Sequence, residues 1–369
     1  MIDERLLKSE ERAAFSLRSL YRKYGYLPFK MSKFEEYEIY IRNKDFLVSD
    51  RIITFNDTNG RLMALKPDVT LSIIKNGEDI PGCKQKVYYS ENVYRVSDST
   101  HNYKEIMQAG LECIGDVDLY DIYEVTSLAA QSLAVISDAF VLEVSHLGIL
   151  SAVLDEISSD EIFRKSVIGF IAEKNAHDLE RLCSEYGATA DAAEKLSAFI
   201  TVYGNRAQVL SRLRPVCSSP SAAAALEEFS RLSAMLENSP FSDKIIYDFS
   251  VVNDMNYYSG LVFKGFVDGI CDGVLSGGQY DKLMEKMGRS SGAVGFALYL
   301  DLLEQLKSPK SAHDVEVLLI YDEETDKALL TRKVEELVTQ GKTVSAQRNI
   351  PPRLRYKELV RLGKEGTLC

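Results

Sequence analysis

Residues 105–114, Glu-Ile-Met-Gln-Ala-Gly-Leu-Glu-Cys-Ile, decide the fold class because their polarity alternates. Every second position is apolar: Met107, Ala109, Leu111 and Cys113. The positions between them are Gln108, Gly110 and Glu112. A period of two predicts a β-strand with one face on a core. The other face is either a solvated sheet surface or a pocket floor, in which Gly110 leaves clearance for a ligand.

Segments on either side predict more sheet and flanking helices. Residues 86–96 are expected to pair with 105–114, and residues 47–66 to form a hairpin around the Asn59-Gly60 turn. Pro67 and the residues after it open a helix, whose capping residue the sequence leaves undetermined. An amphipathic period over 4–24 predicts a helix that Gly25 ends.

The second half of the chain predicts helices, more strands and a small separate module. Residues 120–240 are expected to be mostly helical, including Tyr123–Phe140 and Ala222–Leu236. Strands are expected at 245–252 and 261–267, Gly277-Gly278 as a tight strand-to-helix turn, and 292–306 as helical or strand-to-helix. A linker at 307–311 precedes a strand, a helix and a strand, at 315–321, 324–340 and 343–346.

Composition narrows the class of protein. The 369 residues carry a net charge of −11, which disfavours nucleic acid as a partner because phosphate contacts need cations. No apolar run reaches the ~20 residues of a membrane helix, and the acidic N-terminus is not a signal peptide. The 6 Cys form no CxxC pair and the 4 His are dispersed, so we expect reduced thiols, no metal site and a cytoplasmic location.

Several motifs, in this order, resemble the core of histidyl-tRNA synthetases over about residues 5–305. They are Leu65–Thr70, Val93-Tyr94-Arg95, Tyr103-Lys104-Glu105 with Gln108–Glu112, Met255–Phe263, Ser276–Asp281 and Val294–Leu298. The resemblance implies an α+β fold with a class II aminoacyl-tRNA synthetase-like antiparallel sheet flanked by helices. It divides the chain into a core at 1–306, with a helical insertion at about 145–243, and a small C-terminal α/β module at 313–369. It also implies a homodimeric core.

The same resemblance implies a histidine-binding site. Asp68, Thr70 and Gln108 would hold the α-amino group, and Arg95 would pair with the carboxylate. Glu112, Tyr257, Tyr258 and Tyr280 would face the imidazole or lie beside it. Each of these residues taken alone has an ordinary explanation: the tyrosines as core residues, and Asp68 as a helix-start residue.

Most departures from the synthetases fall on the residues that handle ATP, and one, Ser32, falls in the first motif, which the resemblance assigns to the dimer interface. Asn253 stands where the family has an Arg, and Asp301-Leu302 replaces a Glu-Arg pair. Ser32 replaces a Pro, Ser97 a Glu and Asn102 an Arg, and the loop between Arg95 and Tyr103 is one residue short. Because a single donor to a developing charge is often worth about 3 kcal/mol, these losses predict that adenylate formation is crippled.

A synthetase-like core with an amino-acid pocket and no ATP chemistry is similar to the regulatory subunits of ATP phosphoribosyltransferase. That resemblance implies no catalytic residues, no cofactor and no tRNA charging. It implies a hetero-octamer with a short-form catalytic subunit, and feedback inhibition by L-histidine in the first step of histidine biosynthesis. The alternatives are an active histidine–tRNA ligase, which Asn253 and Leu302 disfavour, and a free-standing histidine sensor.

Overall fold

A computed structural model describes residues 7–43, 52–77, 80–96, 101–252, 257–306 and 312–363. The chain divides into two compact units, Met1–Leu306 and Lys307–Cys369. None of the helices in the described ranges is long and apolar enough to cross a membrane.

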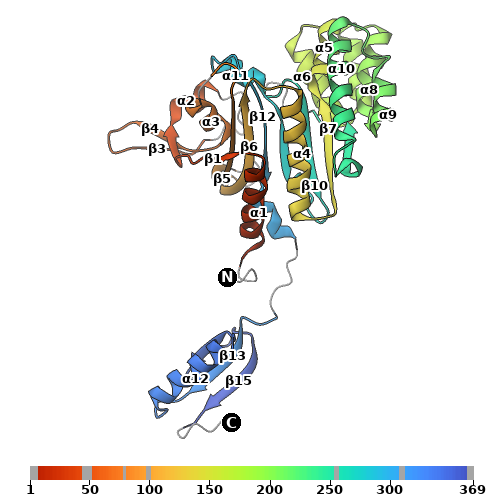
Figure 1. The fold of residues 1–369 in the computed structure, drawn as a ribbon. Coiled ribbons are helices and arrows are strands. Elements are labelled where there is room, and N and C mark those ends of the chain that lie inside the picture. The colour runs from red at the N-terminus through yellow and green to blue at the C-terminus, as the bar shows by residue number, and fades with distance from the viewer. Residues whose placement is uncertain are drawn as a thin grey trace. The chain divides into compact units, whose positions relative to one another are not determined.

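Strands of the large unit form its central sheet (Figure 1). They are Leu27–Pro28 (β1), Lys84–Val96 (β5), Tyr103–Gly115 (β6), Phe140–His146 (β7), Tyr203–Gly204 (β8), Ile245–Asp248 (β9), Leu261–Val267 (β10), Leu275–Gln279 (β11) and Gly292–Tyr299 (β12). Their order is β1-β5-β6-β12-β11-β10-β7-β9-β8. Only the β1–β5 and β7–β9 pairs of this sheet are parallel. The predicted pairing of 86–96 with 105–114 is confirmed, with Tyr89 opposite Gly110.

Helices α1 (Ser9–Lys23) and α4 (Leu119–Ile136) lie side by side on one face of this sheet (Figure 1). Helix α1 buries Leu17 and Tyr21, as its amphipathic period predicts, and Gly25 follows its end at φ 81°. Helix α4 begins where the Asp118 side chain accepts the backbone N–H groups of Tyr120 and Asp121.

Three of the expectations for the second half are wrong in detail. The predicted helix Tyr123–Phe140 ends at Ile136, and β7 follows because alternating Phe140, Leu142 and Val144 pack into the core between β10 and β9. The predicted strand 245–252 ends at Asp248. Gly277-Gly278 is not a turn: both residues lie within β11 and pair with its two neighbours. For residues 292–306, by contrast, the strand-to-helix alternative is confirmed: strand β12 is followed by the 3₁₀ helix η4 (Leu300–Gln305).

A small sheet and short helices lie on the opposite face of the central sheet. They are Phe34–Glu36 (β2), Thr54–Asn56 (β3), Leu62–Leu65 (β4), Tyr37–Arg42 (α2), Thr70–Asn76 (α3) and Asp281–Lys286 (α11). The predicted hairpin is confirmed as β3 and β4, with Gly60 at φ 77° in the turn. The Asp57 carboxylate accepts the N–H groups of Asn59 and Arg61, which fixes this turn.

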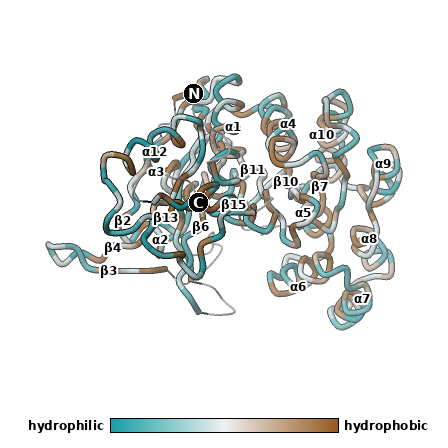
Figure 2. Tube along the Cα trace, turned by 90° about the horizontal axis from the view of Figure 1, so that it is seen from below, coloured by the Kyte–Doolittle hydropathy of each residue, from teal (hydrophilic) through white to brown (hydrophobic). Residues whose placement is uncertain are grey.

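Six helices form the insertion beside the β7–β9 end of the sheet (Figure 1 and Figure 2). They span Leu147–Ile157 (α5), Glu161–Ala172 (α6), Ala176–Glu185 (α7), Ala190–Thr201 (α8), Arg206–Leu213 (α9) and Pro220–Leu236 (α10), and the 3₁₀ helix Ser242–Lys244 (η3) follows. Side chains such as Asp160 and Ser219 cap their N-termini.

The small unit is a three-stranded parallel sheet with one helix. Its elements are Val315–Tyr321 (β13), Lys327–Thr339 (α12), Val344–Gln347 (β14) and Tyr356–Leu362 (β15), with strand order β14-β13-β15. The predicted strand, helix and strand are confirmed, whereas β15 was not predicted. Val317, Leu319 and Val360 pack against Leu337 of α12.

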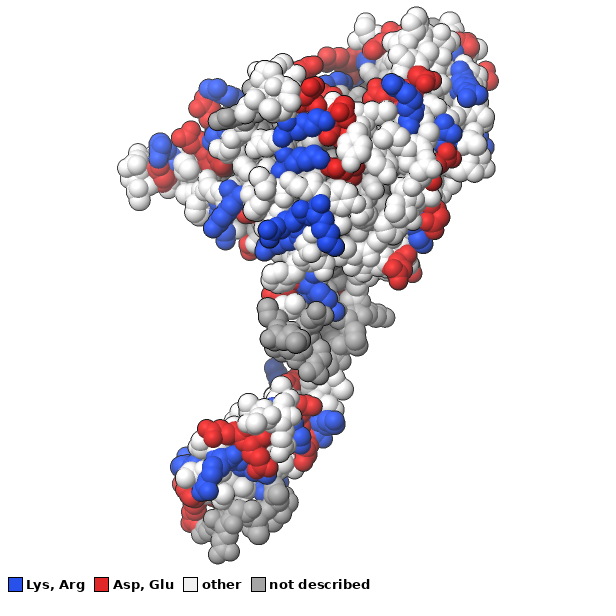
Figure 3. All heavy atoms as spheres, in the orientation of Figure 1, with Lys and Arg blue, Asp and Glu red and all other residues white. Residues whose placement is uncertain are grey.

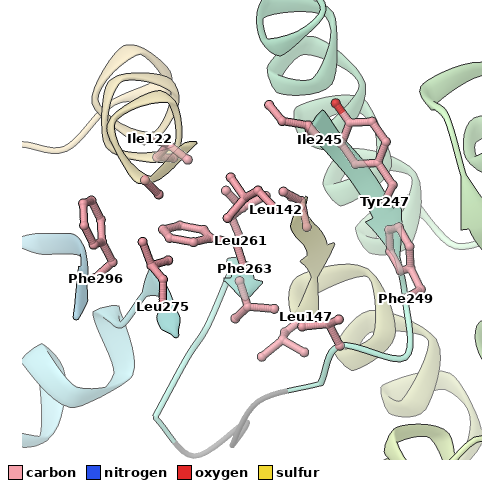
Figure 4. Close-up of a cluster of buried hydrophobic side chains, with 14 of the residues drawn as sticks. Ile122, Leu142, Leu147, Ile245, Tyr247, Phe249, Leu261, Phe263, Leu275 and Phe296 are labelled. Carbon is pink, nitrogen blue, oxygen red and sulfur yellow. The ribbon is translucent and has the colours of Figure 1, made fainter. Parts of the chain in front are cut away.

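Apolar side chains from α4, β7 and β9–β12 meet in the main core (Figure 4). His146, at the end of β7, is buried in this core, 6.2 Å from the Phe229 ring between ring centroids. Neither of its ring nitrogens has a hydrogen-bond partner among the described residues. Burial therefore lowers the pKa of His146 from 6.5 to about 4.

This buried histidine predicts acid sensitivity. Because its folded pKa lies below the unfolded one, the stability that the neutral ring provides is present above about pH 6.5 and is lost as the pH falls toward 4. We expect the protein to lose about 2 kcal/mol of unfolding free energy between pH 7 and pH 5 relative to His146→Leu. Urea denaturation at both pH values measures this, and equal losses in the two proteins would contradict it.

Candidate functional site

A cavity of about 570 Å³ opens over the face of the central sheet opposite α1 and α4. Its floor consists of small residues on neighbouring strands: Ser276, Gly295 and Ala297. Such residues leave room above the sheet, and the volume falls within the usual range of small-molecule pockets. Around this floor stand the side chains of α3, β5, β6, β10 and the turn before β10.

All eight residues that the sequence singled out line this one cavity: Asp68, Thr70, Arg95, Gln108, Glu112, Tyr257, Tyr258 and Tyr280. They come from segments that are far apart in the chain, and the pairing of β6 with β5 and β12 brings them together. The alternation in 105–114 has the expected result, because Gln108 and Glu112 face the cavity while Leu111 faces the core.

Glu112 is a buried carboxyl group held by two hydroxyl groups. Thr70 Oγ1 donates to its Oε1 at 2.9 Å, and the Tyr280 hydroxyl donates to its Oε2 at 2.5 Å. The pKa of Glu112 is raised from 4.5 to about 8, mainly by burial. The two hydroxyl donors oppose this rise, and the nearby Asp68 adds to it. The carboxylate thus lacks a compensating cation among the described residues.

Asp68 supplies a second carboxylate and also caps a helix. Its Oδ1 accepts the Leu71 N–H at 2.9 Å, which identifies the residue that caps α3. Burial raises the pKa of Asp68, although that N–H and the Arg95 guanidinium act in the opposite direction. Arg95 itself donates from Nε to the Pro67 carbonyl at 3.0 Å, so its orientation is fixed beside the cavity.

Three tyrosines form an aromatic wall. The rings of Tyr257 and Tyr258 lie 4.6 Å apart, and Tyr257 lies 5.8 Å from Tyr280, between centroids. Gln279 holds the turn that carries the first two, since its Oε1 accepts the Leu261 N–H at 2.8 Å. Gly260 allows this contact, because a Cβ there would lie 2.2 Å from the same oxygen.

Gly110 does not have the role that the pocket-floor interpretation gave it. A Cβ at Gly110 would lie 2.5 Å from the Tyr89 hydroxyl and 2.2 Å from the Phe296 carbonyl oxygen, so its bare backbone accommodates Tyr89 and not a ligand. Gly295 provides the clearance at the cavity instead. A Cβ there would lie 1.7 Å from Glu112 Oε2.

Sequence reasoning missed several lining residues. The charged and aromatic ones are Tyr89, Lys264, Asp272, Phe296 and Tyr299. Lys264 interrupts an otherwise apolar predicted strand, and small residues alternate at Ser276 and Gly278 and at Gly295 and Ala297. The sequence therefore contained this pattern, but only the register of β10, β11 and β12 shows that these residues lie on one face of the sheet.

Leu302, which stands where the synthetases have an Arg, lies on η4 and packs against the main core. Arg95 and Lys264 are the cations among the described lining residues. Asn253 and Ser97 lie outside the described residues, as do the intermediate positions 98–100 of the shortened loop. Ser32 Oγ accepts the Phe34 N–H at 3.1 Å, and Asn102 lies in the exposed segment before β6.

This arrangement suits a small molecule with several N–H donors and one carboxylate. Glu112 is buried without a compensating cation among the described residues, and Asp68 places a second carboxyl group beside it. This pair favours a cationic or N–H-rich ligand, whose binding would supply the missing charge compensation. Arg95 provides an opposite charge for an anionic group.

Comparisons with known proteins agree with this fold. The family model for histidyl-tRNA synthetase matches residues 2–303. An ATP phosphoribosyltransferase regulatory subunit of Oceanobacillus iheyensis is 27% identical over 289 residues, which cover 78% of this chain and 71% of that protein. The predicted class II synthetase-like fold is confirmed.

Two solved structures are similar. An ATP phosphoribosyltransferase regulatory subunit/histidyl-tRNA synthetase from Bacillus halodurans C has a TM-score of 0.78 at 22% identity, covering 98% of this chain and 96% of that one. A chain of the ATP phosphoribosyl transferase complex from Thermotoga maritima has a TM-score of 0.62 at 20% identity, covering 81% of this chain and 97% of that one.

Proposed function

Because the chain belongs to the histidyl-tRNA synthetase family, we propose that it is a non-catalytic member that serves as the regulatory subunit of an ATP phosphoribosyltransferase and binds L-histidine. The observation that carries the proposal is the cavity in which the buried Glu112 has no compensating cation among the described residues and lies near a second carboxyl group, that of Asp68. Curated relatives named ATP phosphoribosyltransferase regulatory subunit support the choice of complex.

The proposed pose uses each wall of the cavity. The α-ammonium of histidine lies against Asp68, Thr70 and Gln108, and its carboxylate pairs with Arg95. The imidazole enters between Glu112 and Tyr258, with Tyr257 and Tyr280 beside it. Glu112 accepts an imidazole N–H, and the enclosed position strengthens that hydrogen bond.

Adenylate formation is not part of the proposed function. The three phosphates of ATP need several cations for their binding, and the only cations among the described lining residues are Arg95 and Lys264. Leu302 packs into the core and cannot donate to a nucleotide. We therefore propose that the chain charges no tRNA. From the widely spaced cysteines we also propose that it acts in the cytoplasm.

Regulation requires a second protein and two states of the assembly. We propose a short-form catalytic subunit as the partner in a hetero-octamer built on homodimers of this chain. The similarity to a chain of the ATP phosphoribosyl transferase complex from Thermotoga maritima supports such a pairing. Histidine can inhibit only if it binds the two states of the assembly unequally, and such coupling is typically ~1–3 kcal/mol.

Reconstitution tests this function. The full-length chain is mixed with a short-form catalytic subunit from the same organism, and turnover of ATP and phosphoribosyl pyrophosphate is followed with and without histidine. We expect the catalytic subunit to need this chain for turnover, and saturating histidine to reduce the rate by about 10-fold or more. No activation would contradict the proposal. Activation without sensitivity to histidine would contradict its regulatory part.

The two alternatives have their own readouts. Histidine-dependent exchange between ATP and pyrophosphate by the chain alone would show an active ligase and overturn the non-catalytic assignment. A free-standing sensor would bind histidine yet neither bind nor activate the catalytic subunit.

The variant Glu112→Gln in the reconstituted complex tells whether histidine acts through this cavity. Activation of the catalytic subunit should persist, while the histidine concentration for half inhibition should rise about 10-fold or more.

A further inference from the structure

The cavity is larger than the proposed histidine pose requires. Its volume of about 570 Å³ corresponds to about 19 waters at the ~30 Å³ that each occupies in the liquid, and histidine has fewer non-hydrogen atoms than that. The pose leaves Lys264, Asp272 and Gly273 unused, although these residues line the cavity as well. We call them, together with Ser276 of β11, the Lys264 compartment.

The side chain of Tyr258 separates this compartment from the position of the imidazole. Its ring lies over β11, because a Cβ at Gly278 would be 2.8 Å from Tyr258 Cδ1. Two residues earlier on the same strand, Ser276 hydrogen-bonds to the Tyr258 hydroxyl. Strands β12 and β6, which carries Glu112, lie on one side of β11, and β10 lies on the other. A ligand group that contacts Lys264 on β10 therefore occupies a different place from the imidazole.

Lys264 is a half-buried cation that lacks a carboxylate partner. Over much of the large unit's face in Figure 3, Lys and Arg side chains lie beside those of Asp and Glu, and Lys84 and Lys86 of β5 form such ion pairs. Among the described residues, Lys264 forms none, and its ammonium lies 5.3 Å from the Phe266 ring centroid. An unpaired ammonium in a cavity favours an anionic ligand, since an opposite charge there offsets its partial desolvation.

The chain around Lys264 makes room for its side chain. A Cβ at Gly273 would lie 2.3 Å from Lys264 Cε and 3.1 Å from its Cγ, so the bare backbone at Gly273 accommodates the aliphatic stem. Asp272, which precedes this glycine, adds a carboxylate to the same wall of the cavity. An ammonium donor beside a carboxylate acceptor suits a ligand that has both a negative charge and hydroxyl groups.

We propose that the Lys264 compartment binds a small sugar phosphate while histidine occupies the part of the cavity beside Glu112. Lys264 pairs with the phosphate, as lysine commonly does as a point charge, and Asp272 accepts hydrogen bonds from sugar hydroxyl groups. A single phosphate needs fewer cations than the three phosphates of ATP. The inference goes beyond the proposed function, which assigns no ligand to this compartment.

Calorimetry on the full-length chain tests the compartment, with ribose 5-phosphate, ribose and inorganic phosphate as probes in the absence and presence of saturating histidine. Lys264→Gln removes the charge, Gly273→Ala displaces the ammonium but keeps its charge, and Asp272→Asn removes the acceptor charge. The control is Lys244→Gln, since Lys244 is also a half-buried lysine near an aromatic ring, 5.9 Å from the Phe140 centroid, and lies outside this cavity. Circular dichroism checks the folding of every variant.

We expect ribose 5-phosphate to bind the histidine-saturated chain and Lys264→Gln to weaken this binding at least 10-fold, with histidine affinity and folding unchanged. Gly273→Ala should weaken it about 5-fold, and Lys244→Gln should behave like the unmodified chain. Asp272→Asn should weaken binding of ribose 5-phosphate but strengthen that of inorganic phosphate, because the carboxylate helps the sugar and repels the free anion.

Three results would overturn the inference: no binding of ribose 5-phosphate to the unmodified chain, equal binding to Lys264→Gln, or displacement of the sugar phosphate by histidine. Binding of inorganic phosphate as tight as that of ribose 5-phosphate would refute the sugar as part of the ligand. The proposed function fails separately. A chain that neither binds histidine nor activates the catalytic subunit, yet binds ribose 5-phosphate through Lys264, would refute that function and support this inference.

Discussion

At pH 8, Glu112→Gln is expected to be more stable than the unmodified ligand-free protein by about 4 kcal/mol, yet to bind histidine more weakly. The pKa of Glu112 is raised from 4.5 to about 8 on folding. The unfolded protein releases the proton of Glu112 near pH 4.5, whereas the folded protein releases it only near pH 8. The folded protein therefore loses stability as the pH rises from about 4.5 through 8. Glutamine has the same shape and never ionises.

Urea denaturation at pH 5, 6, 7 and 8 measures this effect, and calorimetry measures histidine affinity. The gain in unfolding free energy of Glu112→Gln over the unmodified protein should be small at pH 5 and grow toward pH 8. The affinity of the variant for histidine should be about 10–100-fold lower. Glu105→Gln, on the exposed part of the same strand, is the control and should change neither quantity. Parallel pH profiles for the two proteins would reject the buried-charge explanation. Unchanged affinity would reject Glu112 as a ligand contact.

Gly295→Ala is expected to lower histidine affinity more than 100-fold and to destabilise the protein by about 1–3 kcal/mol. The new Cβ would lie 1.7 Å from Glu112 Oε2 and 2.5 Å from the Leu111 carbonyl oxygen. The carboxylate can rotate away, but the paired β6 backbone cannot move without breaking its register. Both the position of Glu112 and the packing of two strands are therefore disturbed.

Gly169→Ala is the matched control for this substitution. Gly169 lies inside α6, and a Cβ there meets nothing within 4 Å. It should stabilise the protein by up to about 1 kcal/mol and leave histidine binding unchanged. Denaturation and calorimetry on both variants measure the contrast. Wild-type affinity in Gly295→Ala would show that the ligand does not depend on Glu112 or the cavity floor.

Sequence patterns predicted most of the framework of the site because those patterns are local. The alternation over 105–114 placed Gln108 and Glu112 on the face opposite Leu111, and Pro67 marked the start of the helix that Asp68 caps. Periodicity depends only on neighbours in the chain. Individual side chains could therefore be assigned to a face before their distant partners were known.

Predictions that depended on distant contacts failed. Gly110 looked like clearance for a ligand, but Tyr89 from the adjacent strand occupies that space. Gly277 and Gly278 looked like a turn, but both lie within β11, where β10 and β12 approach too closely to leave room for a Cβ. The strand β7 was taken for part of a helix, since pairing with β10 and β9 overrides local helical preference.

By itself the sequence determined the class II framework, the polar strip on residues 108–112 and the identity of eight candidate ligand contacts, because strand periodicity and ordered motifs are properties of the chain. Only the tertiary structure decided that these eight residues share one cavity and that Glu112 lies there with its pKa raised. The burial of a side chain and the compensation of its charge depend on tertiary contacts between strands and helices, and a local sequence pattern does not determine those contacts.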